Sequence, residues 1–172
     1  MLSMKIINAF AEAAQEVLAA ETSRNFARGE MELSDHVYLS EEVTVIISLM
    51  GQIMGTVLYT LTEATALDLA GHLMGEPFAA FNNLAQSGIA ELGNVITGRA
   101  SGKLAQAGYE ILISPPTLLI GKGTALSTLD LPRLFIPLSS PEANLGLHLA
   151  LRKTDALHLA HPDGDLRPGV AA

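Results

Sequence analysis

Residues 84–107, LAQSGIAELGNVITGRASGKLAQA, decide how the rest of this sequence is interpreted. At 100° per residue, the segment divides into two stripes, as a long amphipathic helix does. One stripe is apolar or small apart from a single Lys, and we predict that it faces the core: Ala85, Ile89, Leu92, Ile96, Ala100, Lys103 and Ala107. The opposite stripe is polar or small, and we predict that it faces outward: Ser87, Glu91, Asn94, Gly98, Ser101 and Ala105.

Glu91 and Asn94 are three positions apart, so their side chains project side by side from the outward stripe. A solvated helix face is the simpler interpretation of such a pair. Two features favour a functional face instead. Asn is a poor residue for a helix interior, and Gly93, Gly98 and Gly102 each cost about 1 kcal/mol relative to Ala. A helix weakened in this way indicates close packing or the close approach of a partner.

Two other segments also have helical periodicity. Residues 4–23 place apolar side chains on one face, although their one Lys and Ala-rich end resemble a signal peptide. The acidic and amide residues in the middle of that segment exclude a signal peptide. Residues 63–74 form a second helix that Gly75 and Pro77 end. Asn83 is predicted to cap the long helix at its start.

The remaining elements are predicted strands. Residues 43–62 carry no charge and are about long enough to span a membrane, but repeated Thr and Ser residues and two glycines interrupt them. Their alternating pattern favours a hairpin, 43–50 and 53–61, that turns at Gly51 and Gln52. Five further strands are predicted, at residues 31–39, 109–113, 117–120, 131–138 and 145–151.

This order of elements predicts an α+β fold made of duplicated helix–three-strand units, with a β-sheet packed against long helices. A chain of 172 residues suits one domain. We expect that domain to span residues 1–153. Residues 154–172 are rich in Pro, Gly and small residues, and we expect them to form a flexible C-terminal tail.

Composition excludes several classes of function. The net charge of −8 disfavours nucleic acid and anionic membrane surfaces as partners, and 5% aromatic residues leave little for stacking on bases. The absence of Cys excludes disulfides, Cys-ligated metals and a thiol nucleophile, and is compatible with a cytoplasmic protein.

The order of motifs resembles that of one known family. The pattern Ser87-x-x-x-Glu91-x-x-Asn94, within SGIAELGN, is followed by VITGRASGKL and then by SPPTLLIGKG. It is similar to the CheC/CheX/FliY family, phosphatases of the chemotaxis response regulator CheY, in which an Asp or Ser precedes the Glu and Asn and a Pro follows the helix. Pro116 lies one residue short of the family spacing, and Pro115 lies beside it. One such motif, rather than two, resembles CheX more than CheC.

The resemblance implies a mechanism and its residues. The substrate is an aspartyl phosphate on a CheY-like receiver domain, and the Mg²⁺ belongs to that partner, so the chain needs no cofactor of its own. Asn94 orients the attacking water, because an amide both accepts and donates hydrogen bonds. Glu91 forms a salt bridge with a Lys of the regulator. Ser87, Gly98 and Ser101 are expected to contact the partner, and a homodimer is also implied.

Three alternatives stay open at this point. The chain could be a catalytically inactive adaptor of the same fold, or a small-molecule domain with a closed pocket beside Asn94. Glu12 and Gln15 have the same spacing on the first helix and could form a second site, against a solvated helix face. A metal-binding cluster in the tail is a weaker hypothesis, based on His158, His161, Asp163 and Asp165.

Overall fold

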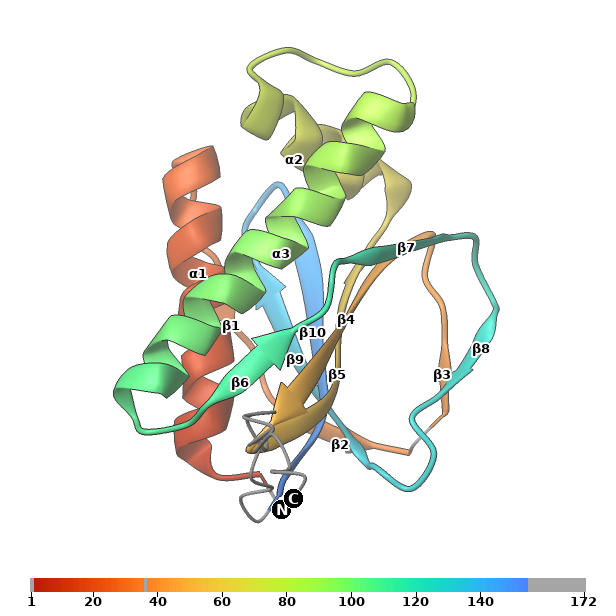
Figure 1. Cartoon of the computed structure of the whole chain (residues 1–172). Coiled ribbons are helices and arrows are strands. Elements are labelled where there is room, and N and C mark those ends of the chain that lie inside the picture. Colours follow the sequence, from red (N-terminus) through yellow and green to blue (C-terminus); the bar gives the residue numbers. More distant parts are fainter. Residues whose placement is uncertain (1, 36, 155–172) are drawn as a thin grey trace, which may run out of the picture.

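The computed structural model describes residues 2–35 and 37–154 (Figure 1). The elements of this part are α1 (Met4–Thr22), β1 (Ala27–Arg28), β2 (Glu32–Ser34), β3 (Val37–Leu39), β4 (Val43–Gly51), β5 (Ile53–Leu61), α2 (Glu63–Met74), α3 (Asn83–Gln106), β6 (Ile111–Ile113), β7 (Thr117–Ile120), β8 (Ala125–Ser127), β9 (Arg133–Ser139) and β10 (Asn144–Lys153). The expected tail lies outside the described residues except for Thr154, whose hydroxyl donates to the carbonyl of Gly51 at 2.6 Å. No helix of the described part is long and apolar enough to cross a membrane.

Eight strands form one sheet in the order β1-β9-β10-β5-β4-β6, with β2 also paired to β9 and β7 also paired to β4. The hairpins β4–β5 and β9–β10 meet in the middle of the sheet, where β5 and β10 pair antiparallel. Strands β1 and β2, after α1, pair with β9, whereas β6 and β7, after α3, pair with β4. Each half of the chain therefore supplies the edge of the other half. This arrangement confirms the α+β class and gives the predicted duplication a structural form.

Helices α1 and α3 lie side by side across one face of the sheet (Figure 1). Alternate residues of β4 are buried under them, namely Val43, Val45, Ile47 and Leu49. The predicted inner stripe of α3 is buried at Ala85, Ile89, Leu92, Ile96 and Ala100. Burying each large aliphatic side chain stabilises the fold by about 1.5–3 kcal/mol. Apolar residues recur every 2 positions in β4 and about every 3.6 in α3, so each element has one apolar face, and these two faces pack together.

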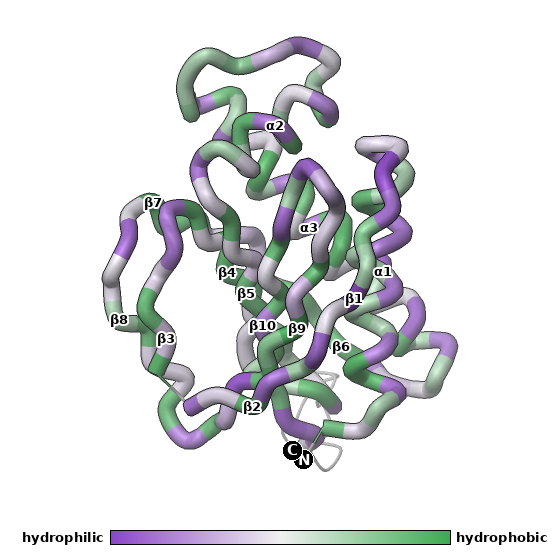
Figure 2. The backbone as a smooth tube through the Cα atoms, turned by 180° about the vertical axis from the view of Figure 1, so that it is seen from behind, coloured by the Kyte–Doolittle hydropathy of each residue, from purple (hydrophilic) through white to green (hydrophobic). Residues whose placement is uncertain are grey.

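The other face of the sheet is partly covered by the pair β3–β8, which forms a separate two-stranded sheet (Figure 1). Seen from behind, the apolar colour follows the neighbouring strands β9, β10 and β5 (Figure 2). Large apolar side chains of this region are exposed, including Leu33, Val37, Leu39 and Leu129.

A buried polar cluster lies on this second face around His148. Its Nδ1 accepts from Arg133 Nη1 at 2.6 Å, and its Nε2 lies 3.2 Å from Thr60 Oγ1. Because Nδ1 accepts, Nε2 carries the proton and donates to Thr60. The centroid of the Tyr38 ring lies 5.0 Å from that of His148, with the rings tilted by 49°, and the Arg133 guanidinium lies over the Tyr38 ring. Burial, together with the nearby Arg133 charge, lowers the pKa of His148 to about 3, so the imidazole is neutral in the folded protein.

Two predictions of local structure are wrong. Residues 31–39 are not one strand, because β2 pairs with β9 in the main sheet and β3 pairs with β8 in the separate sheet. The short strands β1 and β8 have no predicted counterpart. Both errors concern segments of two or three residues, in which pairing partners distant in sequence, rather than a local alternation, define the strand. The hairpin turn at Gly51 and Gln52 is confirmed.

Candidate functional site

Helix α3 begins one residue earlier than predicted. Asn82, not Asn83, is the N-cap, and its Oδ1 accepts from the backbone N–H groups of Leu84 and Ala85 at 3.1 and 3.0 Å. The cap satisfies two of the unpaired donors at the helix start. In a sequence with two consecutive Asn residues, the cap is the one whose backbone is extended, and the tertiary structure decides that.

Residue Gly93 brings the middle of α3 very close to the sheet. A Cβ built onto it would lie 2.8 Å from Val45 Cγ1 and 3.2 Å from Tyr59 Cδ2. By contrast, a Cβ on Gly98 or Gly102 would meet no atom within 4 Å. The glycines therefore divide between the two interpretations that the sequence allowed: Gly93 permits close packing, whereas Gly98 and Gly102 lie on the open side.

Glu91 and Asn94 both face outward, as predicted. Glu91 is exposed and Asn94 is partly exposed. Asn94 Nδ2 donates to Glu91 Oε2 at 3.4 Å, a long contact that confirms that the two side chains are neighbours. A partly exposed amide can hold a water molecule while the exposed carboxylate beside it binds a cationic side chain of a partner.

The other predicted contact residues lie on the same open surface. Ser87 is exposed, but its hydroxyl donates to the carbonyl of Asn83 at 2.9 Å within the helix. Gly98 is exposed and Ser101 is partly exposed. Together with Glu91 and Asn94, these three residues make up what we call the α3 face.

Sequence reasoning missed two apolar residues of this face. Leu84 and Val95 are 49% and 40% exposed, so two large apolar side chains lie on the open side of α3. At 100° per residue, they lie 20° and 40° from Glu91, on the side away from Asn94. The same helical projection that placed Asn94 contains this signal. Exposed apolar side chains beside a polar pair are typical of a protein-binding surface.

The Pro pair borders this region. Pro115 and Pro116 join β6 to β7, two strands that pair with the same strand, β4. Both strands contact α3. The Pro115–Pro116 connection, which is part of the family resemblance, therefore lies next to α3.

The edge of α3 next to α1 is attached to that helix by ion pairs. Lys103, predicted to face the core, instead pairs with Glu16 at 2.7 Å and Glu12 at 3.3 Å, and Arg99 pairs with Glu16 at 3.2 Å. The hydrogen bond from Lys103 lowers the pKa of Glu16. The prediction of a core-facing Lys103 is therefore wrong: the residue lies at the boundary between the two helices, where its stem packs and its charge is partly exposed.

Glu12 and Gln15 do not form a second copy of the site. Gln15 Nε2 donates to the carbonyl of Phe26 at 2.7 Å, and Glu12 pairs with Lys103. The amide that would hold a water molecule is engaged with the protein backbone. Gln15 therefore has a structural contact, whereas Glu12 is an exposed member of a surface ion pair.

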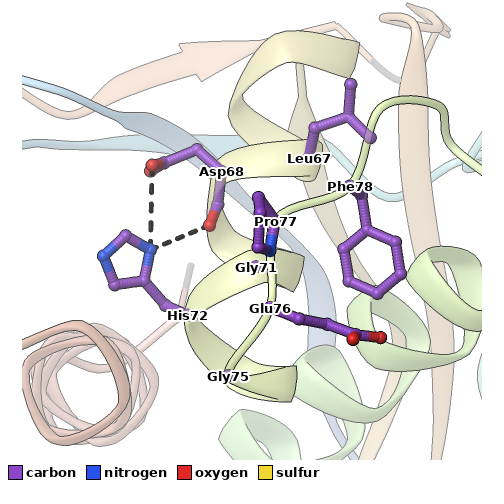
Figure 3. Close-up of a pocket in the computed structure, with 8 residues that line it drawn as sticks. All are labelled: Leu67, Asp68, Gly71, His72, Gly75, Glu76, Pro77 and Phe78. Atoms are coloured by element: carbon purple, nitrogen blue, oxygen red, sulfur yellow. Dashed lines mark hydrogen bonds and ion pairs between the residues drawn. The ribbon is translucent and has the colours of Figure 1, made fainter.

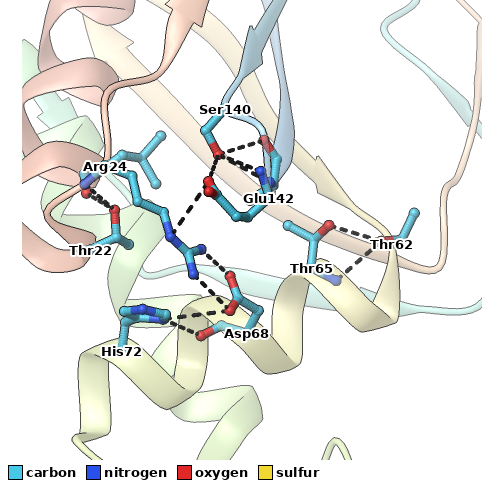
Figure 4. Close-up of polar contacts among 10 residues, drawn as sticks. Thr22, Arg24, Thr62, Thr65, Asp68, His72, Ser140 and Glu142 are labelled. Carbon is cyan, nitrogen blue, oxygen red and sulfur yellow. Dashed lines mark hydrogen bonds and ion pairs between the residues drawn. The ribbon is translucent and has the colours of Figure 1, made fainter.

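A further polar cluster is centred on Arg24 and Asp68 (Figure 4). Arg24 bonds Asp68 through both terminal nitrogens, and its Nε lies 3.8 Å from Glu142. His72 lies 3.7 Å from Asp68. This cluster connects the end of α1 to α2 and to the β9–β10 turn, and it raises the pKa of Arg24 through the Asp68 hydrogen bond.

An open hollow of about 510 Å³ lies on the outer side of α2, where Asp68 and His72 meet the Glu76–Phe78 segment (Figure 3). A smaller hollow lies between Leu33 and Pro132. Neither is lined by Asn94, so these hollows give no support to a closed small-molecule pocket beside the α3 face.

Within residues 2–35 and 37–154, no group of three or more His, Cys, Asp and Glu side chains could hold a metal ion. The candidate cluster His158, His161, Asp163 and Asp165 lies outside the described residues.

Comparison with known proteins places this geometry in a family. The family model described as chemotaxis phosphatase CheX matches residues 43–139. The CheY-P phosphatase CheX of Thermotoga maritima is 26% identical over 153 residues, which cover 88% of this chain and 98% of that protein.

Solved structures agree with this fold. A CheC-like superfamily protein from Shewanella sp. PV-4 superposes with a TM-score of 0.79 at 23% identity, over 88% of this chain and 99% of that chain. The structure of the CheX–CheY–BeF3–Mg²⁺ complex from Borrelia burgdorferi contains a chain with a TM-score of 0.73 at 27% identity, over 86% of this chain and 97% of that one. Because the family model covers more than half of the 172 residues, this protein belongs to the CheX family of chemotaxis phosphatases, as the SGIAELGN motif predicted.

Proposed function

We propose that this protein accelerates hydrolysis of the aspartyl phosphate on a CheY-like receiver domain in the cytoplasm, through Asn94 and Glu91. The observation that carries the proposal is the open α3 face of a CheX-family chain, on which these two side chains are neighbours. The phosphatase domain in this proposal comprises residues 1–153.

The chemistry of an acyl phosphate explains the choice of residues. Hydrolysis requires a water molecule in line with the phosphorus, and the protein contributes mainly by holding that water in position. The Asn94 amide oxygen orients the water by accepting a hydrogen bond from it. No proton is transferred to the amide. A carboxylate in the same place would be repelled by the phosphoryl oxygens.

Glu91 therefore acts beside the reacting group. We assign to it a salt bridge with a Lys of the receiver domain, which fixes the register of docking. Mg²⁺ is supplied by the receiver domain in this scheme. The Borrelia complex, whose composition includes CheY and Mg²⁺, supports a CheY-like partner that brings the Mg²⁺.

The rest of the α3 face supplies the surface on which the receiver domain docks. Gly98 is open to solvent, so a receiver domain can come close to the helix backbone there. Ser87, about three turns before Gly98, and Ser101, about one turn after it, lie on the same open surface of α3. Leu84 and Val95 add the apolar contacts that usually supply most of the affinity of such an interface.

The substitution Asn94→Ala tests the catalytic assignment. We expect binding of a BeF3-activated receiver domain to change by less than about twofold, and stimulated dephosphorylation to fall about 100-fold, since the water is no longer positioned. Gln106→Ala is the control, because it removes another exposed amide from the same helix. Equal rates of phosphoryl decay with wild-type and Asn94→Ala protein would exclude this role of Asn94.

The substitution Glu91→Lys tests docking. Reversing the charge opposite a receiver Lys should weaken binding, and Glu91→Gln should weaken it less. The alternative function, an inactive adaptor, predicts that the wild-type protein binds the receiver domain without shortening the lifetime of its phosphoryl group. The decay assay separates the two functions directly.

A homodimer is part of the proposed function. Its support is the set of exposed apolar side chains on and around the β3–β8 pair, because large exposed apolar groups usually mark a protein interface. Sedimentation equilibrium of the full chain tests this. A single species at monomer mass over the micromolar range would contradict the dimer without affecting the assignment of the α3 face.

A further inference from the structure

A hydrogen-bonded pair of hydroxyls lies directly beneath the α3 face. Tyr59 of β5 and Thr97 of α3 are 1% and 0% exposed, and their oxygens are 2.7 Å apart. The Thr97 hydroxyl also donates to the carbonyl of Gly93 at 2.8 Å. Since Thr97 has one hydroxyl proton and uses it on Gly93, Tyr59 must be the donor to Thr97. Burial raises the pKa of Tyr59, so the phenol keeps its proton under all physiological conditions.

The same part of the helix is also its point of closest packing. Gly93 leaves no room for a Cβ against Val45 and Tyr59. Gly93 and Thr97 are one turn apart and bracket Asn94 in sequence. The ring of Tyr59 therefore limits how far α3 approaches the sheet, and its hydroxyl bonds to one particular residue of the helix. The two contacts together define the rotation of α3 about its axis.

Rotation of the helix has a direct effect on Asn94. The amide end of a helical side chain lies about 6 Å from the axis, so a rotation of about 10° displaces it by about 1 Å. A displacement of that size at a reacting centre is enough to lower a rate by about 100-fold. Binding of the partner tolerates such a rotation better, since apolar contacts such as those of Leu84 and Val95 are non-directional and do not need the close alignment that the reacting atoms need.

We propose that Tyr59 and Thr97 are positioning residues that set the orientation of Asn94 by bonding the sheet to the backbone of α3 at Gly93. This inference rests on the proposed function for its catalytic consequence. The positioning itself is a property of the free protein and can be measured without the receiver domain.

Tyr59→Phe tests the proposal because it removes one oxygen and keeps the ring that fills the core. We expect kcat for dephosphorylation to fall about 3- to 10-fold, with the affinity for a BeF3-activated receiver domain unchanged within about twofold. Tyr38→Phe is the matched control: its ring is also buried, and its hydroxyl accepts from the N–H of Glu41, but it lies on the other face of the sheet. Its kcat should equal that of the wild type.

Variants of Thr97 provide a rescue test. Thr97→Ser keeps the hydroxyl and should retain kcat, whereas Thr97→Val keeps the shape and should lower kcat as Tyr59→Phe does. A purely structural role predicts that both variants lose activity only in proportion to the unfolded fraction. An unchanged kcat in folded Tyr59→Phe protein, or equal losses of kcat and affinity, would overturn the proposal.

A second readout needs no catalytic activity. In ¹⁵N-labelled protein, the side-chain amide signals of Asn94 should shift in Tyr59→Phe and stay unchanged in Tyr38→Phe. Unmoved signals in Tyr59→Phe overturn the positioning role even if the phosphatase activity is real. A shift in a protein without phosphatase activity would support the positioning role and reject the proposed function.

Discussion

The substitution Gly93→Ala offers a stringent test of how α3 is packed, because the same helix contains its own control. At Gly93 the added Cβ would lie 2.8 Å from Val45 Cγ1, well inside the usual carbon–carbon contact of about 3.5–4.0 Å. At Gly98 the added Cβ meets nothing within 4 Å. Neither residue has a positive φ, so Ala fits the backbone at both positions.

The free energy of unfolding follows from two opposing terms. Replacing Gly by Ala in a helix interior stabilises it by about 1 kcal/mol at either position. Overpacking of a filled core costs about 1–3 kcal/mol, and it applies at residue 93 alone. We therefore expect Gly98→Ala to stabilise the protein by about 1 kcal/mol and Gly93→Ala to be neutral or to destabilise it by up to about 2 kcal/mol.

Urea denaturation followed by circular dichroism measures the difference between the two variants, in which the propensity term cancels. With a slope of about 2 kcal/mol per molar urea, Gly98→Ala should have a midpoint about 0.5–1.5 M higher than Gly93→Ala. Equal stabilisation of both variants would show that α3 does not approach the sheet at Gly93, and it would remove the basis for the positioning of Asn94.

Two further predictions concern the core and the helix start. His148 has a pKa of about 3 in the fold, against about 6.5 in an unfolded chain, so below pH 6.5 the unfolded state binds the proton that the folded state does not. Stability should therefore fall between about pH 6.5 and 3, by up to about 1.4 kcal/mol per pH unit, and His148→Gln should flatten this part of the profile in urea titrations at several pH values. A wild-type profile as flat as that of the variant would mean that His148 is protonated in the fold. At the helix start, Asn82→Ala should cost about 1 kcal/mol of unfolding free energy, since two backbone N–H groups lose their acceptor, whereas Asn83→Ala should cost less. A larger loss in Asn83→Ala, by the same denaturation assay, would return the cap to Asn83.

Much of the α3 face could be predicted from the sequence because a helix is a local structure. A fixed rotation of 100° per residue places Glu91 beside Asn94 and opposite Ile89 and Ile96 before any other part of the chain is considered. The same rule would have found Leu84 and Val95 if apolar residues on the polar stripe had been examined. The hairpin β4–β5 was equally predictable, since alternation and one turn define it.

Other features could not be predicted, because they depend on residues far apart in the chain. Lys103 fits the core stripe by angle, yet it lies at the margin where α1 supplies Glu12 and Glu16. Gln15 has the spacing of a second site, but the carbonyl of Phe26 occupies its amide. Strand β1 exists because β9 lies beside it, and a two-residue segment carries no periodicity that could reveal this.

The sequence by itself therefore determined the family, the α+β class and the pair of side chains that α3 turns outward, since these depend on local spacing along one helix and on a short motif. Only the tertiary structure decided which glycine packs against the sheet, which Asn caps α3, and which tyrosine bonds to the helix beneath Asn94. The glycine and the tyrosine are selected by the contacts of Val45 and Tyr59 with α3, because these residues lie far from the helix in sequence and meet it only when the sheet and the helix pack together.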